Sequence, residues 1–105
     1  MSILSKLLQK RGVDESGLSP EEKTQYDNWK RILTEEGITV EKIADFCRQM
    51  ISVIESKWAS LEISADKKAE LVPYHTVYRA IQQVIDGPKS ERERLEKYLN
   101  QLLES

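Results

Sequence analysis

The apolar residues of this chain recur every three or four positions, which is the spacing that puts side chains on one face of an α-helix. No stretch with the alternating pattern of a half-buried β-strand competes with these helical stripes. The pattern predicts an all-α, single-domain bundle of four to five helices over residues 1–105. We expect a long helix from Thr39 to Ala59 at its centre, with a helix that contains Pro73 packed against it.

Capping residues mark where two of the helices begin. Ser19 precedes Pro20 and is followed three residues later by Glu22, which predicts a capping box with proline at the first helical position. Ser90 and Glu93 have the same spacing and predict a second capping box for the last helix. Both signals depend only on residues close together in the chain.

The central helix, for which Thr39 is the predicted N-cap, has the widest apolar face in the sequence. So wide a face indicates that neighbours pack against it on two sides. Trp58 near its end and Trp29 on the preceding helix are each large enough to anchor either a core or an interface, and we favour burial for both. The main stripe comprises Val40, Ile43, Cys47, Met50, Ile54 and Leu61.

A further apolar stripe runs from Leu71 to Ile85 and passes Pro73 without changing phase. Proline lacks a backbone N–H and crowds the carbonyl oxygen of Ala69, four residues earlier. This helix is therefore predicted to be kinked or broken at Pro73, and in the second case residues 66–72 form a separate helical turn. The unbroken phase of the stripe favours the kink.

Composition and charge narrow the classes of function. Hydrophobic residues make up 39% of the chain and charged residues 32%, a balance typical of a well-folded helical domain. The net charge is −2 and no segment is strongly basic, which disfavours a nucleic-acid partner. No apolar run approaches the roughly 20 residues of a membrane span, and the N-terminus lacks a secretory pattern. We expect a cytoplasmic protein, in the host cell if the protein is viral.

The single Cys47 and the single His75 are the residues with the chemistry of a catalytic pair. Cys47 lies within the central stripe, where burial is expected to raise its pKa and keep the thiol unreactive. His75 falls on the flank away from its helix's apolar face, beside Arg79, and is interpreted as a surface histidine. One cysteine and one histidine complete a zinc site only with carboxylates or a second chain. The sequence predicts no catalytic residue, no metal site and no cofactor.

The two terminal helices are the best candidates for a partner-binding surface. Residues 1–11 form a short helix with four aliphatic side chains on one stripe, followed by a loop over 12–19 that would leave the helix mobile. This helix either docks on its own domain or enters a groove on another molecule. An uncovered stripe on either terminal helix would favour self-association. The candidate partner-binding residues are Ile3, Leu4, Leu7, Leu8, Leu99, Leu102 and Leu103.

Two segments resemble parts of a helix-turn-helix protein. EGITVEKIADF, which begins at Glu36, resembles the opening helix of the motif, and HTVYRAI, which begins at His75, resembles its recognition helix. The first continues without the glycine turn, and the second has Arg79 where the motif has an apolar residue. The resemblance implies a DNA-associated protein such as a terminase small subunit or a regulator. This is the alternative to a protein-binding function.

The segments LLQKRGV, LSPEEKTQYDNWKRIL and ERERLEKYLNQLL resemble in style the short helical proteins of bacteriophages. That resemblance implies an accessory, packaging or host-modulating role and attaches no function to any residue. From the residues themselves we favour a non-enzymatic protein-protein interaction or assembly module. It would act through an apolar helix face on a protein partner or on a second copy of itself.

Overall fold

The computed structural model describes residues 3–104, and it describes their side chains as far as residue 102. All regular structure in this range is helical, so the all-α prediction is confirmed. α4 and α5 form one helix bent at Leu71, which gives five helices in the range. The elements are α1 (Ile3–Lys10), the 3-10 helix η1 (Glu15–Gly17), α2 (Pro20–Glu36), α3 (Val40–Ala59), α4 (Ala65–Glu70), α5 (Val72–Asp86) and α6 (Lys89–Glu104).

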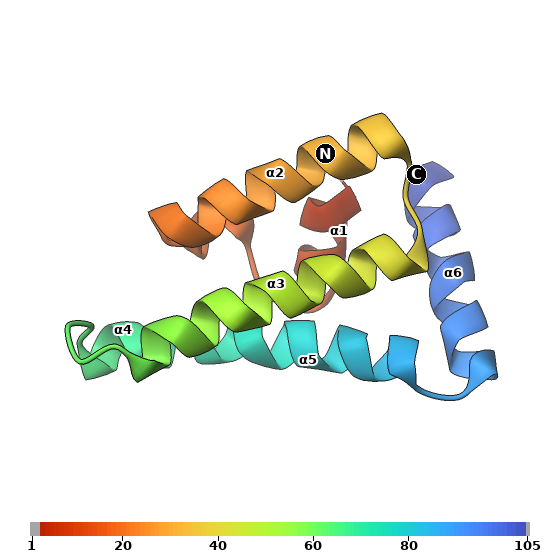
Figure 1. Cartoon of the computed structure of the whole chain (residues 1–105). Helices are drawn as coiled ribbons and strands as arrows, with labels where there is room; N and C mark the ends of the chain where they lie inside the picture. Colours follow the sequence, from red (N-terminus) through yellow and green to blue (C-terminus); the bar gives the residue numbers. More distant parts are fainter. Residues whose placement is uncertain (1–2, 105) are drawn as a thin grey trace.

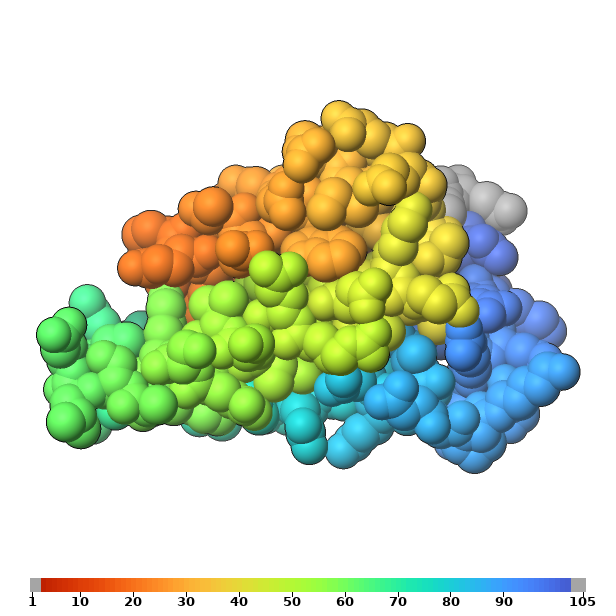
Figure 2. Space-filling model, in the orientation of Figure 1, coloured from red at the N-terminus to blue at the C-terminus, as the bar shows by residue number. Residues whose placement is uncertain are grey.

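The central position predicted for the long helix is confirmed. α3 packs against both α2 and α5, which run along its two sides (Figure 1). α6 crosses the end of the bundle at which α3 begins, and it contacts α1, α3 and α5. The side chains of α2 and α3 meet along the face seen in Figure 2. The width of the apolar face on α3 follows from its having neighbours on both sides.

An aromatic cluster occupies the middle of the core. The ring of Phe46 on α3 makes edge-to-face contacts with Tyr26, Trp29 and Tyr78, at centroid distances of 6.1, 6.4 and 5.5 Å. In this geometry the positive edge of one ring points at the negative face of another. The electrostatic attraction adds to the stabilisation that comes from burying the rings. Phe46 thereby connects α2, α3 and α5.

α1 docks on its own domain. Polar contacts secure it at both edges: Ser5 Oγ donates a hydrogen bond to Glu15 Oε2 at 2.7 Å and shares another with the Tyr26 hydroxyl at 3.0 Å. Lys6 Nζ donates to the carbonyl oxygen of Leu102 at 2.9 Å. The sequence left open whether this helix docks on its own domain or on another molecule, and in the structure it docks on its own domain. The buried residues of α1 are Ile3, Leu4, Ser5, Leu7 and Leu8.

The predicted cap at the start of α2 is present. The Ser19 N–H donates to Glu22 Oε2 at 2.9 Å within a capping box, with Pro20 in the first turn. The predicted cap of α3 is also present, because Thr39 Oγ1 accepts a hydrogen bond from the Lys42 N–H at 3.1 Å. These local signals predicted the helix starts correctly.

The second predicted capping box, formed by Ser90 and Glu93, is wrong. α6 begins at Lys89, so Ser90 lies inside its first turn. The carbonyl oxygen of Pro88 accepts the first helical bonds, from the N–H groups of Glu91 and Arg92 at 3.0 and 3.2 Å. A cap at Ser90 would make Glu91 the first helical residue, so the helix begins two residues earlier than that cap allows.

The helix that contains Pro73 is bent rather than divided. Leu71 separates α4 from α5, yet its φ of −81° and ψ of −16° are helical. The His75 N–H still donates to the Leu71 carbonyl at 3.0 Å. The continuous phase of the apolar stripe thus corresponds to a bent helix, as the kink interpretation requires.

Three apolar side chains are more exposed than the sequence suggested. Trp29 and Trp58 pack against the core but are only partly buried. Their indole N–H groups donate to Gln49 Oε1 and to the Lys68 carbonyl, each at 2.9 Å. Leu61 is 98% exposed, because α3 ends at Ala59 and the helical stripe does not reach it.

Candidate functional site: an apolar groove between α1 and α2

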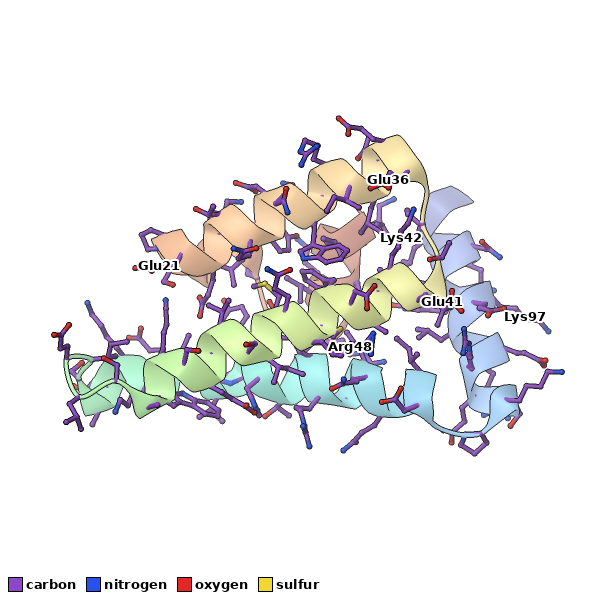
Figure 3. The ribbon with its side chains drawn as sticks, viewed as in Figure 1. Glu21, Glu36, Glu41, Lys42, Arg48 and Lys97 are labelled. Atoms are coloured by element: carbon purple, nitrogen blue, oxygen red, sulfur yellow. The ribbon has the colours of Figure 1, made fainter. Side chains whose placement is uncertain are left out.

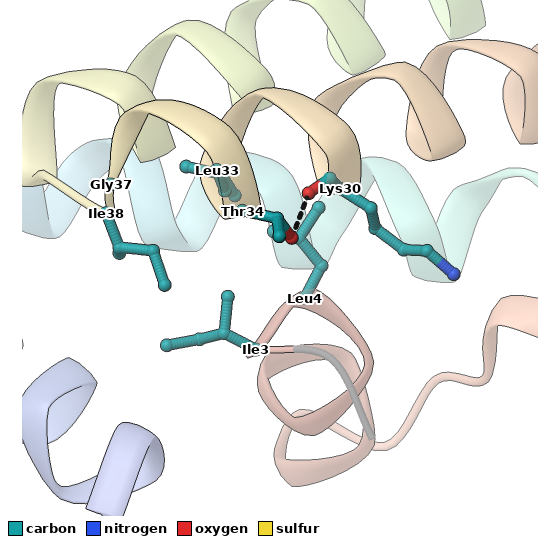
Figure 4. Close-up of a pocket in the computed structure, with 7 residues that line it drawn as sticks. All are labelled: Ile3, Leu4, Lys30, Leu33, Thr34, Gly37 and Ile38. Atoms are coloured by element: carbon teal, nitrogen blue, oxygen red, sulfur yellow. Dashed lines mark hydrogen bonds between the residues drawn. The ribbon is translucent and has the colours of Figure 1, made fainter.

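An apolar groove lies where the start of α1 approaches the end of α2 (Figure 4). Ile3 and Leu4 point from α1 toward α2, and Ile38, in the connection to α3, borders the opposite side. The groove has a volume of about 410 Å³, within the range typical of sites that bind part of a ligand or peptide. We call it the α1–α2 groove. It is lined by Ile3, Leu4, Lys30, Leu33, Thr34, Gly37 and Ile38.

The backbone at the end of α2 fixes one edge of this groove. Gly37 has a φ of 90°, a conformation that side-chain-bearing residues rarely adopt, and it lets the chain leave α2 abruptly. Lys42 Nζ, from α3, then donates to the carbonyl oxygens of Glu36 and Gly37 at 2.9 and 3.2 Å (Figure 3). These bonds satisfy carbonyls at the helix terminus and hold Ile38 beside the groove.

The other edge is polar. Thr34 Oγ1 donates to the Lys30 carbonyl at 2.8 Å, while Lys30 Nζ lies 3.8 Å from Glu15 Oε2 and 3.7 Å from Asp27 Oδ1. The pKa of Glu15 is lowered by its hydrogen bond from Ser5 and then by that of the Tyr26 hydroxyl. Glu15 is therefore held as a carboxylate beside the Lys30 ammonium. The site combines an apolar floor with one charged, hydrogen-bonded margin.

The structure separates the seven predicted partner-binding residues. Ile3 and Leu4 are buried in the core and also line the α1–α2 groove. Leu7, Leu8, Leu99 and Leu102 are buried in the core, where they hold α1 and α6 on the bundle. The side chain of Leu103 lies outside the described residues. The stripes of the terminal helices therefore serve the fold, and the part of α1 nearest its start also borders the groove.

Sequence reasoning missed the lining contributed by Leu33, Thr34 and Ile38. Ile38 stands immediately before the N-cap Thr39, the position from which an apolar residue packs on the fourth residue of the following helix. That signal identifies Ile38 as a packed residue in a connection. No local sequence signal predicts that α1 and α2 face each other across this groove.

Cys47 and His75 do not form a reactive pair. Cys47 is fully buried, and desolvation raises the pKa of its thiol to about 12. His75 Nε2 lies 3.1 Å from Glu55 Oε1, and its ring centroid lies 4.5 Å from that of Trp58. The His75 side chain is 19% exposed, so it lies on the surface flank and is partly covered by Glu55 and Trp58. The sequence offered no sign of Glu55, because that contact crosses from α5 to α3.

Within residues 3–104, no group of three or more side chains is arranged to hold a metal ion. No helix in that range has the length and apolar character needed to cross a membrane. Over the described residues the protein is an all-α bundle, and the α1–α2 groove has an apolar floor with a charged margin. No protein-family model, curated protein or solved structure matches this chain.

Proposed function

We propose that the protein is a non-enzymatic interaction module whose α1–α2 groove receives an apolar side chain from a partner protein or a second copy of the chain. The observation that carries this proposal is the apolar lining contributed by Ile3, Leu4, Leu33 and Ile38. An amphipathic segment would insert one aliphatic or aromatic anchor into the groove. Leu4 and Leu33 have almost no exposed surface, so the hydrophobic gain would come from the anchor itself and from the partly buried Ile38. The charged margin at Lys30 would set the orientation of the segment.

The chemistry of the core supports binding rather than catalysis. The Cys47 thiol is buried with a pKa of about 12, so very little thiolate forms at neutral pH. Among the described residues that line the groove, only Lys30 and Thr34 have side chains with polar ends. Thr34 Oγ1 donates to the backbone carbonyl of Lys30 rather than to a base, and Lys30 Nζ forms ion pairs with the carboxylates of Glu15 and Asp27.

Two threonines of α2 provide a matched test of the groove. Thr34 and Thr24 are both exposed, and each Oγ1 donates to the carbonyl four residues earlier, at 2.8 and 3.0 Å. Only Thr34 lines the groove. Thr34→Arg would place a long charged side chain across the opening, whereas Thr24→Arg adds the same charge elsewhere on the helix.

The measurement is retention of proteins from the producing cells on the immobilised full-length chain, together with sedimentation velocity of the free chain. We expect Thr34→Arg to weaken retention of the specific partner, or self-association, at least tenfold, and Thr24→Arg to leave it unchanged. If every retained protein and the sedimentation coefficient respond equally to both substitutions, the groove is not the binding surface.

The DNA-associated alternative and the phage-related role both stay predictions. Several arginines are engaged with carboxylates: Arg31 Nη1 lies 3.3 Å from Glu35, and Arg48 Nη2 lies 2.5 Å from Asp45. Such pairing reduces the charge available to phosphates. Binding to duplex DNA that falls steeply with salt and is unaffected by Thr34→Arg would favour the alternative.

A further inference from the structure

A second cavity, distinct from the α1–α2 groove, lies at the opposite end of α2. It is bounded by the start of α2, the end of α3, and α4, and its volume is about 320 Å³. Charged side chains from three elements face it, including Glu22, Lys57 and Glu70. Pro20 and Ile63 add apolar wall. We call it the Glu22 cavity.

The carboxylate of Glu22 is fully buried and half satisfied. Its Oε2 accepts the Ser19 N–H at 2.9 Å, but its Oε1 has no hydrogen-bond partner. Lys57 Nζ lies 4.0 Å from Oε1, beyond hydrogen-bond range, and donates instead to Ser19 Oγ and to Glu21 Oε2, the latter at 3.2 Å. A carboxylate oxygen accepts hydrogen bonds and donates none, so only a donor can satisfy Oε1. The Tyr78 hydroxyl is likewise buried without a hydrogen-bond partner, and it makes no hydrogen bond with Oε1. A buried acceptor without a donor is costly.

The balance of charge around the cavity favours a cationic donor. Three carboxylates, those of Glu21, Glu22 and Glu70, line it against the two ammonium groups of Lys57 and Lys67. Glu70 makes no ion pair with any residue whose side chain the structure describes. A ligand with a positive charge would therefore neutralise the excess, as well as supply the missing hydrogen bond.

The apolar part of the cavity wall indicates what the uncharged part of the ligand would be. Pro20, Ile63 and Leu71 present apolar surface beside the charged groups. An alkyl chain of a few carbons would lie against this surface while its charged end meets the carboxylate, as lysine stems do on protein surfaces.

We propose that the Glu22 cavity binds a primary alkylammonium group, which donates a hydrogen bond to Glu22 Oε1 and lays its alkyl chain on Ile63 and Leu71. Lys57 keeps its contacts with Ser19 and Glu21 in the complex. The same chemistry occurs in a free alkylamine and in the side chain of a lysine from another protein. This site is independent of the α1–α2 groove and of the function proposed for it.

The experiment is an NMR titration of the full chain, labelled with ¹⁵N, with n-butylammonium chloride at constant ionic strength. n-Butanol serves as the neutral ligand of matched shape, and sodium chloride as the salt control. We expect saturable shifts at the amides of Ser19, Glu22, Lys57 and Leu71, and an affinity for butylammonium at least tenfold above that for butanol. Shifts that do not saturate, or equal affinities for the two ligands, would overturn the proposal.

Three variants localise the effect. Glu22→Gln keeps an acceptor for the Ser19 N–H but removes the charge, and should weaken butylammonium binding at least tenfold. Glu70→Gln changes an exposed residue and should weaken it about threefold, so the test survives if the buried variant does not fold. Glu36→Gln, at the far end of α2, removes one exposed carboxylate outside the cavity and should have no effect (Figure 3). Equal effects of Glu36→Gln and Glu70→Gln would reduce the site to general charge attraction.

A second ligand distinguishes the two sources of the ammonium group. Nα-acetyl-lysine methylamide presents the same butylammonium within a peptide backbone. Affinity at least threefold above that of butylammonium identifies a protein lysine as the natural ligand class, and lower or equal affinity identifies a free amine. Absence of binding by both ligands contradicts the proposal.

Discussion

Gly17, in the loop between α1 and α2, lies where Tyr74 of α5 passes close to the loop backbone. Tyr74, on α5, donates a hydrogen bond from its hydroxyl to the Asp14 carbonyl at 2.6 Å. A Cβ atom built on Gly17 would lie 2.1 Å from that hydroxyl oxygen. The hydrogen bond to Asp14 holds the loop on the bundle, and a glycine at position 17 leaves room for the tyrosine that makes it.

Gly17→Ala is expected to lower the free energy of unfolding by about 1–3 kcal/mol, since the methyl group must displace the Tyr74 hydroxyl. Urea denaturation followed by circular dichroism measures the change. In a Tyr74→Phe background the clashing oxygen is gone, so the same glycine substitution should cost clearly less. Equal costs in the two backgrounds would show that the hydroxyl is not the obstacle.

The buried Cys47 and Tyr78 side chains are expected to make the protein less stable at alkaline pH. Burial raises the pKa of Cys47 from its ordinary value of 9.0 to about 12, and burial followed by the charge of Glu22 raises the pKa of Tyr78. Both groups stay neutral in the folded chain at pH values where they ionise in the unfolded chain. The unfolded chain then binds fewer protons, so the free energy of unfolding is unaffected below about pH 9 and falls above it.

Comparison of the wild type with Cys47→Ala isolates the thiol. Between pH 7 and pH 10 the free energy of unfolding should fall by about 1.4 kcal/mol more in the wild type than in the variant. The reason is that the thiol of the unfolded chain has a pKa of 9.0, one unit below pH 10, whereas the folded thiol stays protonated. Urea denaturation at the two pH values measures this difference. Identical losses in both proteins would mean that the folded thiol titrates normally.

At the scale of the helix, Thr39 and Ser90 were both predicted from the sequence to be N-caps, but only Thr39 is one in the structure. Thr39 Oγ1 caps α3, whereas Ser90 lies within the first turn of α6. Thr39→Ala should lower the free energy of unfolding by about 1 kcal/mol, and Thr39→Ser should retain most of it. Ser90→Ala should change it by no more than about 0.5 kcal/mol. Thermal or urea unfolding of the three variants checks the order, and a large cost at Ser90 would contradict the observed start of α6.

Helices were predictable from the sequence because their signals are local. The spacing of apolar residues and the capping box at Ser19 involve residues within a few turns of one another. The box at Ser90 failed because the carbonyl of Pro88 accepts the first helical bonds, an alternative start that the same local pattern permits. The bend at Leu71 was predicted as one of two outcomes, since Pro73 disrupts a helix locally while packing decides how far the axis turns.

The groove was predictable only in part, because it belongs to the whole molecule. Ile3 and Leu4 were identified by their aliphatic stripe, but Leu33 and Ile38 reach the same groove from about 30 residues further along the chain. Which stripe faces which neighbour depends on how α1 and α2 approach each other. No periodicity within one helix contains that information. The same reason hid the contact between His75 and Glu55.

The short first helix is part of the core of the whole molecule and not an appendage to it. Leu7 has no exposed surface, and it lies in one continuous core with residues of α3, α5 and α6. Removing its side chain would leave a cavity that the surrounding helices cannot fully close. A domain of this size is expected to unfold in a single cooperative transition, so damage in α1 should destabilise every element together.

Leu7→Ala should therefore lower the global free energy of unfolding by about 2–5 kcal/mol. Leu61→Ala is the matched control, because the same substitution at a side chain that is 98% exposed should change it by no more than about 0.5 kcal/mol. Urea denaturation followed by tryptophan fluorescence and by circular dichroism measures both, since Trp29 and Trp58 report on α2 and α3 while ellipticity reports on all helices. If α1 were a detachable arm, Leu7→Ala and Leu61→Ala would have the same unfolding midpoint when tryptophan fluorescence is measured. A shift of both transitions by the same free energy would show that the first helix and the central helix are stabilised as one unit.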